Sequence, residues 1–262
     1  MNEQKLIRAW LDEEQIAHIC GWDFSHLDGR LEEENTPWCL RDEIRSRLTT
    51  DQMLLDMDTG GGEFLRSLGH PPARTAATEG YPPNIALCRA QLIPAGIDFH
   101  AAESGGVLPF ADASFDMVSN RHGSYDAREV FRVLKPGGYF ITQQVGAEND
   151  RELVELLLPG TPIPFSRQYA GLLAEELSEI GFAVERAEEA YPEMRFRDVG
   201  AVVWFARIIE WEFPSFSVQR CLDRLFAAQK RMCEEGCLST RTHRILLIAH
   251  KGIRGGNGCE IS

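Results

Sequence analysis

Short apolar runs alternate with amphipathic segments along most of this chain. Apolar runs typical of strands cover residues 53–58, 75–79, 97–102, 114–120, 139–144, 183–189 and 244–250. Segments with helical spacing of apolar residues cover 64–68, 82–92, 124–134 and 167–180. Strands that alternate with helices in this way predict βαβ crossovers and a mostly parallel sheet covered on both faces. We therefore expect an α/β fold.

The regions outside this alternation have a different pattern. Residues 3–20 and 38–50 place apolar side chains among charged ones at near-helical spacing, which predicts N-terminal helices. Residues 191–216 are rich in aromatic side chains, and residues 217–235 predict a helix before the last strand. The aromatic segment predicts either a cap over a binding pocket or a small accessory core. Both can hold together, because apolar pockets are lined by aromatic residues.

Three consecutive glycines, Gly60, Gly61 and Gly62, follow the first apolar run and precede the apolar segment 64–68. This order is typical of a buried strand, a tight turn and the start of a helix. Glycine has no Cβ, so its backbone can adopt positive φ and lie directly against a ligand. The first N–H groups of the following helix would point at the same place. The stretch therefore predicts a cofactor-binding turn.

A nicotinamide dinucleotide fold is one alternative for such a turn. Its GxGxxG fingerprint would take Gly60 and Gly62 as the first two glycines, but Leu65 stands at the third position. The third glycine allows close packing of helix on strand, which leucine prevents. This alternative is therefore the weaker one.

The composition limits the class of partner. The net charge of −13 and the pI near 5.0 argue against a nucleic acid partner. Nowhere do eighteen apolar residues follow one another, and the charged N-terminus does not resemble a signal peptide, so we expect no membrane association. The seven cysteines form no CxxC pair, which predicts reduced thiols in a cytoplasmic protein. No HxxxH or paired-carboxylate pattern indicates a metal site.

Three stretches in order resemble the motifs of the class I S-adenosylmethionine-dependent methyltransferases. Leu54–Gly62 resembles the first motif, Leu108–Val118 the LPFxDxSFDxV segment, and Glu129–Gly138 the ExxRVLKPGG segment. The resemblance covers about residues 52–146. It implies S-adenosylmethionine as the cofactor and a Rossmann-like, doubly wound sheet. That sheet would have seven mostly parallel strands with the last one antiparallel, together with N-terminal helices and an aromatic-rich insertion before the last strand.

On this basis we expect four regions along the chain. They are an N-terminal helical cap at 1–50, an S-adenosylmethionine-binding core at 51–190, an aromatic-rich insertion or cap at 191–240, and the last core strand with a mobile tail at 241–262.

The resemblance also implies roles for individual residues. The Gly60–Gly62 backbone would face the methionine part of the cofactor, and Asp56 would brace the loop or reach the cofactor's amino group through water. Glu79 would accept hydrogen bonds from both ribose hydroxyls, because a carboxylate offers two acceptors to two adjacent donors. The complete set implied to bind the cofactor is Asp56, Asp58, Gly60, Gly61, Gly62, Glu79, Gly80, Glu103, Ser104, Asn120 and Arg121.

Two positions depart from the family pattern. Asp58 stands where the motif's first glycine is usual, so this acid either braces the loop or contacts the cofactor's ammonium group. Before the LPF segment, the family often has an acid that meets the adenine amino group. Here Ser104 lies beside Glu103, and either side chain could accept that hydrogen bond.

Methyl transfer from a sulfonium is an in-line displacement, so positioning of the nucleophile and the methyl group dominates the catalysis. His122, with Arg121 and Tyr125 as neighbours, is the candidate base or acceptor-orienting group, although a lone histidine in a loop is commonly structural. The candidate acceptor contacts are Trp22, Tyr125, Gln144 and Trp204. Other side chains that either line the acceptor site or are purely structural are Gln143, Arg167 and Tyr169.

The function we expect is methyl transfer to a small or medium-sized organic acceptor. One alternative is an RNA or protein methyltransferase, but residues 1–50 and 191–262 carry no dense basic patch that would indicate it. Another is a non-catalytic protein that binds S-adenosylmethionine. No pattern predicts an oligomeric state.

Overall fold

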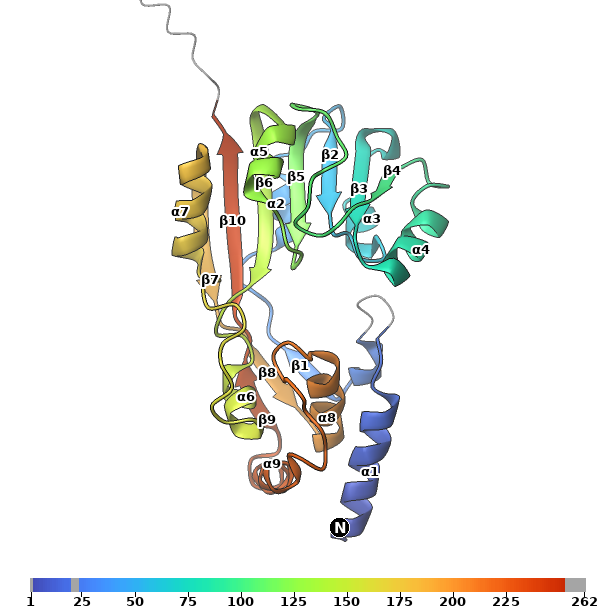
Figure 1. Cartoon of the computed structure of the whole chain (residues 1–262), viewed down its shortest axis with the longest axis vertical. Coiled ribbons are helices and arrows are strands. Elements are labelled where there is room, and N and C mark those ends of the chain that lie inside the picture. Colours follow the sequence, from blue (N-terminus) through green and yellow to red (C-terminus); the bar gives the residue numbers. More distant parts are fainter. Residues whose placement is uncertain (1, 20–23, 253–262) are drawn as a thin grey trace, which may run out of the picture. The chain divides into compact units, whose positions relative to one another are not determined.

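The computed structural model describes residues 2–19 and 24–252, and it divides into two compact units (Figure 1). The core unit consists of Cys39–Gln144, Tyr169–Glu188 and the chain from Ile245 onward. The small unit consists of the chain up to Trp38, Val145–Gln168 and Glu189–Arg244. These boundaries differ from the sequence-based regions, because residues 145–168 join the small unit and each unit is assembled from three separate segments.

The core unit contains the seven-stranded sheet that the sequence predicted, with one antiparallel strand. The strand order is β4-β3-β2-β5-β6-β10-β7. The strands are β2 (Leu54–Met57), β3 (Thr75–Glu79), β4 (Asp98–Ala101), β5 (Phe115–Arg121), β6 (Leu134–Val145), β7 (Phe182–Ala190) and β10 (Arg244–Lys251). The arrow of β10 points opposite to that of β6 in Figure 1. The α/β prediction is therefore confirmed.

The central strands are apolar because both faces of the sheet are covered. All four residues of β2 are buried, as are all five residues of β3. Helices α5 (Ala127–Val133) and α7 (Ala170–Ile180) bury Val130 and Leu177 in one core cluster with Leu55 of β2. The other helices of this unit are α2 (Leu40–Arg45), α3 (Glu63–Ser67) and α4 (Pro82–Gln91), with a 3₁₀ turn at Pro72–Arg74. Figure 1 shows α5 in front of the sheet and α2 behind it.

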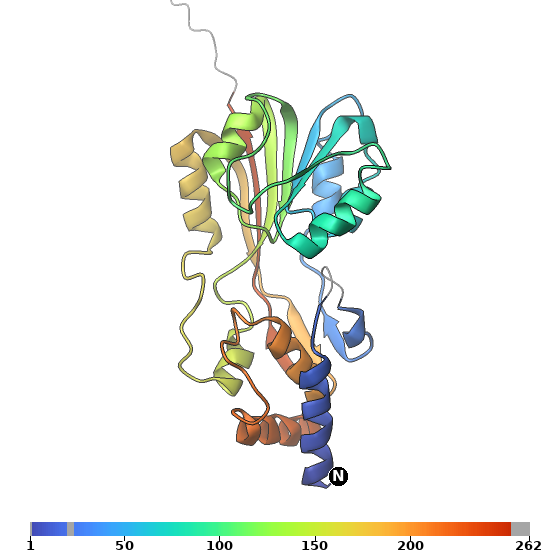
Figure 2. The ribbon, with the colours of Figure 1, turned by 45° about the vertical axis from the view of Figure 1, so that its right-hand side comes forward.

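The small unit has its own sheet, which the sequence did not predict. Strands β1 (Leu31–Glu33), β8 (Glu193–Phe196) and β9 (Leu238–Arg241) pair antiparallel in the order β1-β8-β9. The helices of this unit are α1 (Glu3–Ile16), α6 (Arg151–Leu157), α8 (Val199–Ile208) and α9 (Leu222–Glu235), with a 3₁₀ turn at Ser25–Leu27. Figure 2 shows α1 and α8 side by side. The predicted N-terminal helix thus ends at Ile16, earlier than expected.

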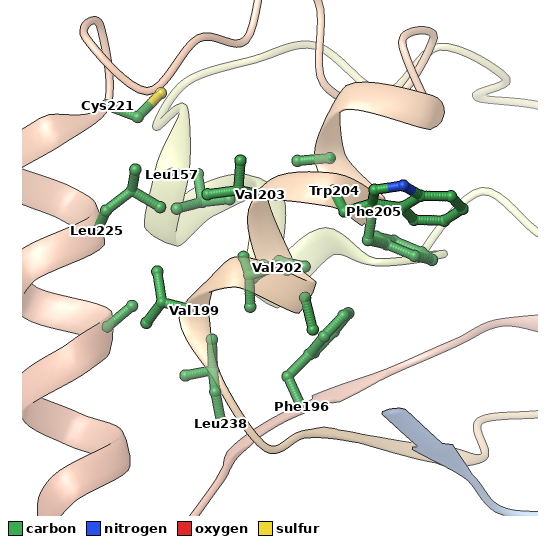
Figure 3. Packing of buried hydrophobic residues seen from close by; sticks show 14 of the residues in the cluster. Leu157, Phe196, Val199, Val202, Val203, Trp204, Phe205, Cys221, Leu225 and Leu238 are labelled. Carbon is green, nitrogen blue, oxygen red and sulfur yellow. The ribbon is translucent and has the colours of Figure 1, made fainter. Parts of the chain in front are cut away.

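The aromatic-rich segment forms the core of the small unit. Helix α8 begins at Val199, where Asp198 caps it by accepting a hydrogen bond from the Ala201 backbone N–H at 2.8 Å. Because residues 199–206 of α8 carry no charged side chain, all of them can be buried, and they are. Figure 3 shows its side chains converging with Leu157 of α6, Leu225 of α9 and Leu238 of β9. The accessory-core interpretation of this segment is therefore confirmed, and its role as a cap stays a prediction.

Two features of the described residues concern the helices and the cysteines. No helix in the described ranges combines enough length with enough apolar character to cross a bilayer. The cysteines that the structure describes are all free: Cys39, Cys88, Cys221, Cys233 and Cys237.

Two acids are buried in the small unit without full hydrogen bonding. Asp150 is 1% exposed and Glu212 is 2% exposed, and one carboxyl oxygen of each lacks a hydrogen-bond partner among the described residues. Burial raises the pKa of Asp150 to about 7, with the Arg244 charge opposing and the Glu33 charge adding to this shift. Burial and the nearby Asp150 charge raise the pKa of Glu212 to about 8, against the charge of Arg151. Both acids therefore hold a proton more readily in the folded chain.

This pair predicts a stability that depends on pH. A carboxyl whose folded-state pKa is raised stabilises fully below its unfolded pKa near 4, and that contribution is lost as the pH rises through 7 to 8. Glu212→Gln should therefore raise the Tm at pH 8.5 by about 2–4 °C and change it little at pH 5. Tryptophan fluorescence during thermal unfolding measures this, with the exposed Glu234→Gln as the control. An equal effect of Glu212→Gln at both pH values would contradict the explanation.

Candidate cofactor and acceptor site

The predicted cofactor-binding residues lie at the carboxyl ends of β2, β3 and β5 and in the loops that follow β2, β3 and β4. Parallel pairing aligns Asp56 of β2 with Ala77 of β3 and with Ser119 of β5. This edge of a doubly wound sheet is where ligands bind in open α/β folds. The loop after β2 takes positive φ at Asp58 (51°), Gly60 (64°) and Gly62 (83°). Helix α3 has only five residues, so the loop itself carries the site.

Asp56 is a buried brace inside this edge. Its carboxylate accepts hydrogen bonds from the Ser119 hydroxyl at 2.6 Å and from the Thr59 hydroxyl at 2.7 Å. Burial raises the pKa of Asp56 to about 6, and the two hydroxyl bonds and the Arg121 charge partly oppose that rise. Asp56 therefore ties β5 and the glycine loop to β2, which matches the bracing role among the two that the sequence allowed.

Glu79 holds the glycine loop through backbone groups. One carboxylate oxygen accepts from the Gly60 N–H at 2.7 Å, and the other accepts from the Gly80 N–H at 2.9 Å and the Tyr81 N–H at 2.8 Å. The side chain is 4% exposed. A carboxylate has about four acceptor positions, so this arrangement leaves about one for a further donor. Contact with both ribose hydroxyls would require one of the hydrogen bonds from these backbone N–H groups to lengthen.

Asp58 joins three loops at the edge. Its carboxylate accepts a short hydrogen bond from the Ser104 hydroxyl in the loop after β4. A Cβ atom at Gly123, in the loop after β5, would lie 2.5 Å from the Asp58 side chain. Burial raises the pKa of Asp58 to about 6, the Ser104 bond opposes this rise, and the Glu79 charge adds to it. The residue that departs from the family pattern is therefore central to the site.

Close packing of backbone brings the loops after β3 and β4 together. A Cβ atom at Gly80 would lie 2.9 Å from both the Ala102 carbonyl oxygen and the Ser104 amide nitrogen. At Gly62 the backbone has φ +83°, and a Cβ would lie 2.6 Å from a methyl carbon of Leu92 in the chain after α4. A side chain at either position would therefore clash with its neighbours. The contact at Gly80 also brings the loop that contains Glu103 and Ser104 close to the end of β3.

Asn120 and Gln144 form a buried amide network at the ends of β5 and β6. Gln144 Nε2 donates to Asn120 Oδ1 at 2.6 Å and to Thr142 Oγ1 at 2.7 Å. Asn120 Nδ2 donates to the Met57 carbonyl at 3.2 Å, and Asn120 is fully buried. Both side chains therefore act first as braces, while their roles as cofactor and acceptor contacts stay predictions.

His122 and Arg121 lie on the exposed side of the same rim. The His122 backbone adopts φ +61°, and its Nε2 lies 3.1 Å from the Gln143 side-chain nitrogen, which donates to it. This bond places the proton of a neutral ring on Nδ1. The Arg121 guanidinium lies 5.4 Å from the centre of the Phe64 ring of α3. Gln143 is thus the partner that orients His122.

The other acceptor candidates have packing roles. The Tyr125 ring packs edge-on against Phe140 at 4.9 Å, and burial followed by the Glu176 charge raises the pKa of its hydroxyl. Trp204 is 2% exposed within the small-unit core and stacks on His26 at 5.2 Å, which leaves little surface for an acceptor. Arg167 belongs to the small unit, and Tyr169 directly precedes α7 in the core unit. Trp22 lies outside the described residues.

Sequence reasoning missed several residues that hold the site. Ser119 and Thr59 bind Asp56, and the Cys88 thiol donates to the Gly60 carbonyl at 3.0 Å. The available signal was Ser119 itself, a polar residue that follows Met117 and Val118 within β5. No group of three or more potential metal ligands gathers within the described ranges.

The chemistry of this edge fits an S-adenosyl cofactor. Glu79 retains acceptor capacity for a ribose hydroxyl, and Asp58 has a carboxylate engaged by one hydroxyl group. Gly62 and Gly80 lie so close to neighbouring atoms that neither position has room for a side chain. The acceptors therefore match the hydroxyl and ammonium donors of such a ligand.

Comparison with known proteins identifies a domain in this chain. Residues 55–142 match the family model of a methyltransferase domain. A phthiotriol/phenolphthiotriol dimycocerosates methyltransferase of Mycobacterium tuberculosis is 33% identical over 111 residues, which cover 40% of each chain. The matched stretch thus spans well under half of the curated relatives' length.

Solved structures share the fold at low identity. A candidate methyltransferase of Bacillus halodurans matches with a TM-score of 0.56 at 17% identity, over 81% of this chain and 98% of its own. The [4+2]-cyclase SpnF matches with a TM-score of 0.51 at 18% identity, over 95% of this chain and 94% of its own. Residues 55–142 therefore match a methyltransferase domain, and these solved structures share its Rossmann-like fold.

Proposed function

We propose that this protein transfers a methyl group from S-adenosylmethionine to a small or medium-sized organic acceptor. The observation that carries the proposal is the edge built by Asp56, Asp58, Glu79 and the Gly60–Gly62 loop. When bound, the cofactor supplies an electrophilic methyl group on a sulfonium. Gly60–Gly62 would hold its methionine part, Glu79 its ribose, and Ser104 or Glu103 its adenine.

The acceptor is proposed from charge and from the relatives. The net charge of −13 disfavours a nucleic acid acceptor. The name of the mycobacterial relatives specifies a triol as what they methylate, so acceptors that carry a hydroxyl group belong in the first screen. A hydroxyl keeps its proton at neutral pH, so such an acceptor gains from a general base.

Calorimetry followed by an acceptor screen tests the proposal. The whole chain is titrated with S-adenosylmethionine and with S-adenosylhomocysteine, and then incubated with S-adenosylmethionine and candidate acceptors while S-adenosylhomocysteine release is measured. Binding together with release that depends on an acceptor supports the proposal. Binding without release for every acceptor class favours a non-catalytic protein, and absence of binding overturns the proposal.

His122 is the proposed base or orienting group for a protonated acceptor. His122→Ala should lower kcat about 100-fold and leave affinity for S-adenosylhomocysteine nearly unchanged, because the hydrogen bonds that hold the glycine loop come from Asp56, Glu79 and Cys88. Gln143→Ala should give a smaller loss, since it removes only the group that orients the ring. Turnover of His122→Ala equal to that of the unmodified chain would exclude the role.

A further inference from the structure

The acids at the cofactor edge differ in how many hydrogen bonds they accept from other groups of the protein. The Asp56 carboxylate accepts from two hydroxyls, and the Glu79 carboxylate accepts from three backbone N–H groups. Asp58 accepts a single side-chain hydrogen bond, from the exposed Ser104. Asp58 therefore has the largest remaining capacity to interact with a ligand.

Asp58 also adopts a backbone conformation that is unfavourable for a residue with a side chain. Its φ of +51° lies in the left-handed region, which costs a non-glycine residue about 1 kcal/mol. The next two positive-φ positions of the same loop, 60 and 62, are glycines. An acid in place of glycine at such a position points to a role that depends on its side chain.

The charges around Asp58 are mostly negative. Glu79 of β3 and Asp56 of β2 lie on neighbouring elements and interact electrostatically with it. Glu103 precedes Ser104 in the loop after β4. On β5 and its loop, Arg121 is the nearby cation, and its guanidinium rests on Phe64, while the His122 ring is hydrogen-bonded to the Gln143 side chain. The edge therefore favours a cation over a neutral ligand of the same shape.

We propose that Asp58 makes the site discriminate by charge, so that it binds the sulfonium cofactor more tightly than the neutral thioether product. This inference rests on the proposed function. In the reaction, an electron pair of the acceptor would form the bond to the methyl carbon while the S–CH₃ bond breaks and its electron pair stays on sulfur. The proton of a hydroxyl acceptor would pass to the proposed base, His122. Sulfur thus loses its positive charge. The attraction to Asp58 weakens at that moment, which favours product release.

The ratio of the two affinities isolates this effect. The ratio meant is the Kd of S-adenosylhomocysteine divided by the Kd of S-adenosylmethionine. Both ligands carry the same amino and carboxyl groups, so the contributions of these groups largely cancel in the ratio. Because burial raises the pKa of Asp58 to about 6, its charge is present above that pH and absent below it. The ratio should therefore rise as the pH increases from 5 to 8.

Calorimetry at pH 5, 6, 7 and 8 on the whole chain tests the proposal. Asp58→Asn should lower the ratio at pH 8 by about fivefold or more and remove most of its rise with pH, the remainder coming from Asp56, whose pKa burial also raises to about 6. Ser104→Ala keeps the acid but removes a bond that favours its charged form, so the midpoint of the pH dependence should move upward. The control is Glu175→Gln on α7, which removes an exposed negative charge away from this edge and should retain the ratio.

The outcomes separate this proposal from the proposed function. A ratio in Asp58→Asn that equals the unmodified ratio at every pH overturns charge discrimination while cofactor binding stands. Absence of binding by the unmodified chain overturns the proposed function itself. If Asp58→Asn does not fold by circular dichroism, the test uses Asp58→Gly, which suits positive φ, together with Ser104→Ala. An unmoved midpoint in Ser104→Ala with an unchanged ratio in Asp58→Gly would contradict the proposal.

Discussion

Glu79→Ala is expected to lower the free energy of unfolding by about 3 kcal/mol and the affinity for S-adenosylhomocysteine by about 100-fold. The substitution removes the acceptor of the Gly60, Gly80 and Tyr81 N–H groups. Each buried donor left unpaired costs about 1–3 kcal/mol, and water can reach part of this set. The glycine loop also loses its tie to β3. Circular dichroism in guanidinium and calorimetry measure the two effects.

The matched control is Glu103→Ala. Glu103 is an exposed acid at the same edge, and its carboxylate holds no glycine-loop N–H. Its replacement should therefore change the free energy of unfolding by less than about 0.5 kcal/mol. If Glu79→Ala and Glu103→Ala lowered stability equally, the Glu79 carboxylate would not be what holds the loop.

Phe196→Ala is expected to destabilise the small unit by about 3–5 kcal/mol. Phe196 is fully buried on β8, and its ring packs edge-on against Phe205 of α8 at 5.3 Å. All five tryptophans of the chain fall within the segments of the small unit, so tryptophan fluorescence in a guanidinium titration follows this unit. The midpoint of that transition should move to lower denaturant.

Phe165→Ala provides the same chemical change at an exposed site. Phe165 belongs to the small unit and is 51% exposed, so its removal should move the transition little. A shift for Phe165→Ala as large as that for Phe196→Ala would mean that the β8–α8 contact does not dominate this core.

The alternation of strands and helices between Met53 and Gln144 was readable from the sequence because short runs of strand length alternate with segments of helical spacing. Strand β3 occupies the predicted residues, Thr75–Glu79. The second sheet was not readable. Its strands have three or four residues and include LEE and EMRF, too short and too charged to show a period of two.

The identity of the site residues was predictable where a motif specifies the residue type. Their hydrogen-bond partners were not predictable, because these depend on how the strands pack. Asp56, Asp58, Glu79 and Ser104 gather at one edge as expected, because parallel strands end together. That Asp56 is held by Ser119 depends on the register between β2 and β5. Asn120 shows the same dependence, since its amide partner Gln144 lies on the neighbouring strand.

The assembly of each unit from three segments has a consequence for biosynthesis. The buried Leu6 and Trp10 of α1 pack in one cluster with residues of α8, which the ribosome adds about 10–40 s later at ordinary rates of translation. In the core unit, β10 lies between β6 and β7, so both strands keep an unpaired edge until Arg244–Lys251 has been made. The nascent chain therefore exposes apolar surface and open strand edges through most of its synthesis, the state in which chaperones act.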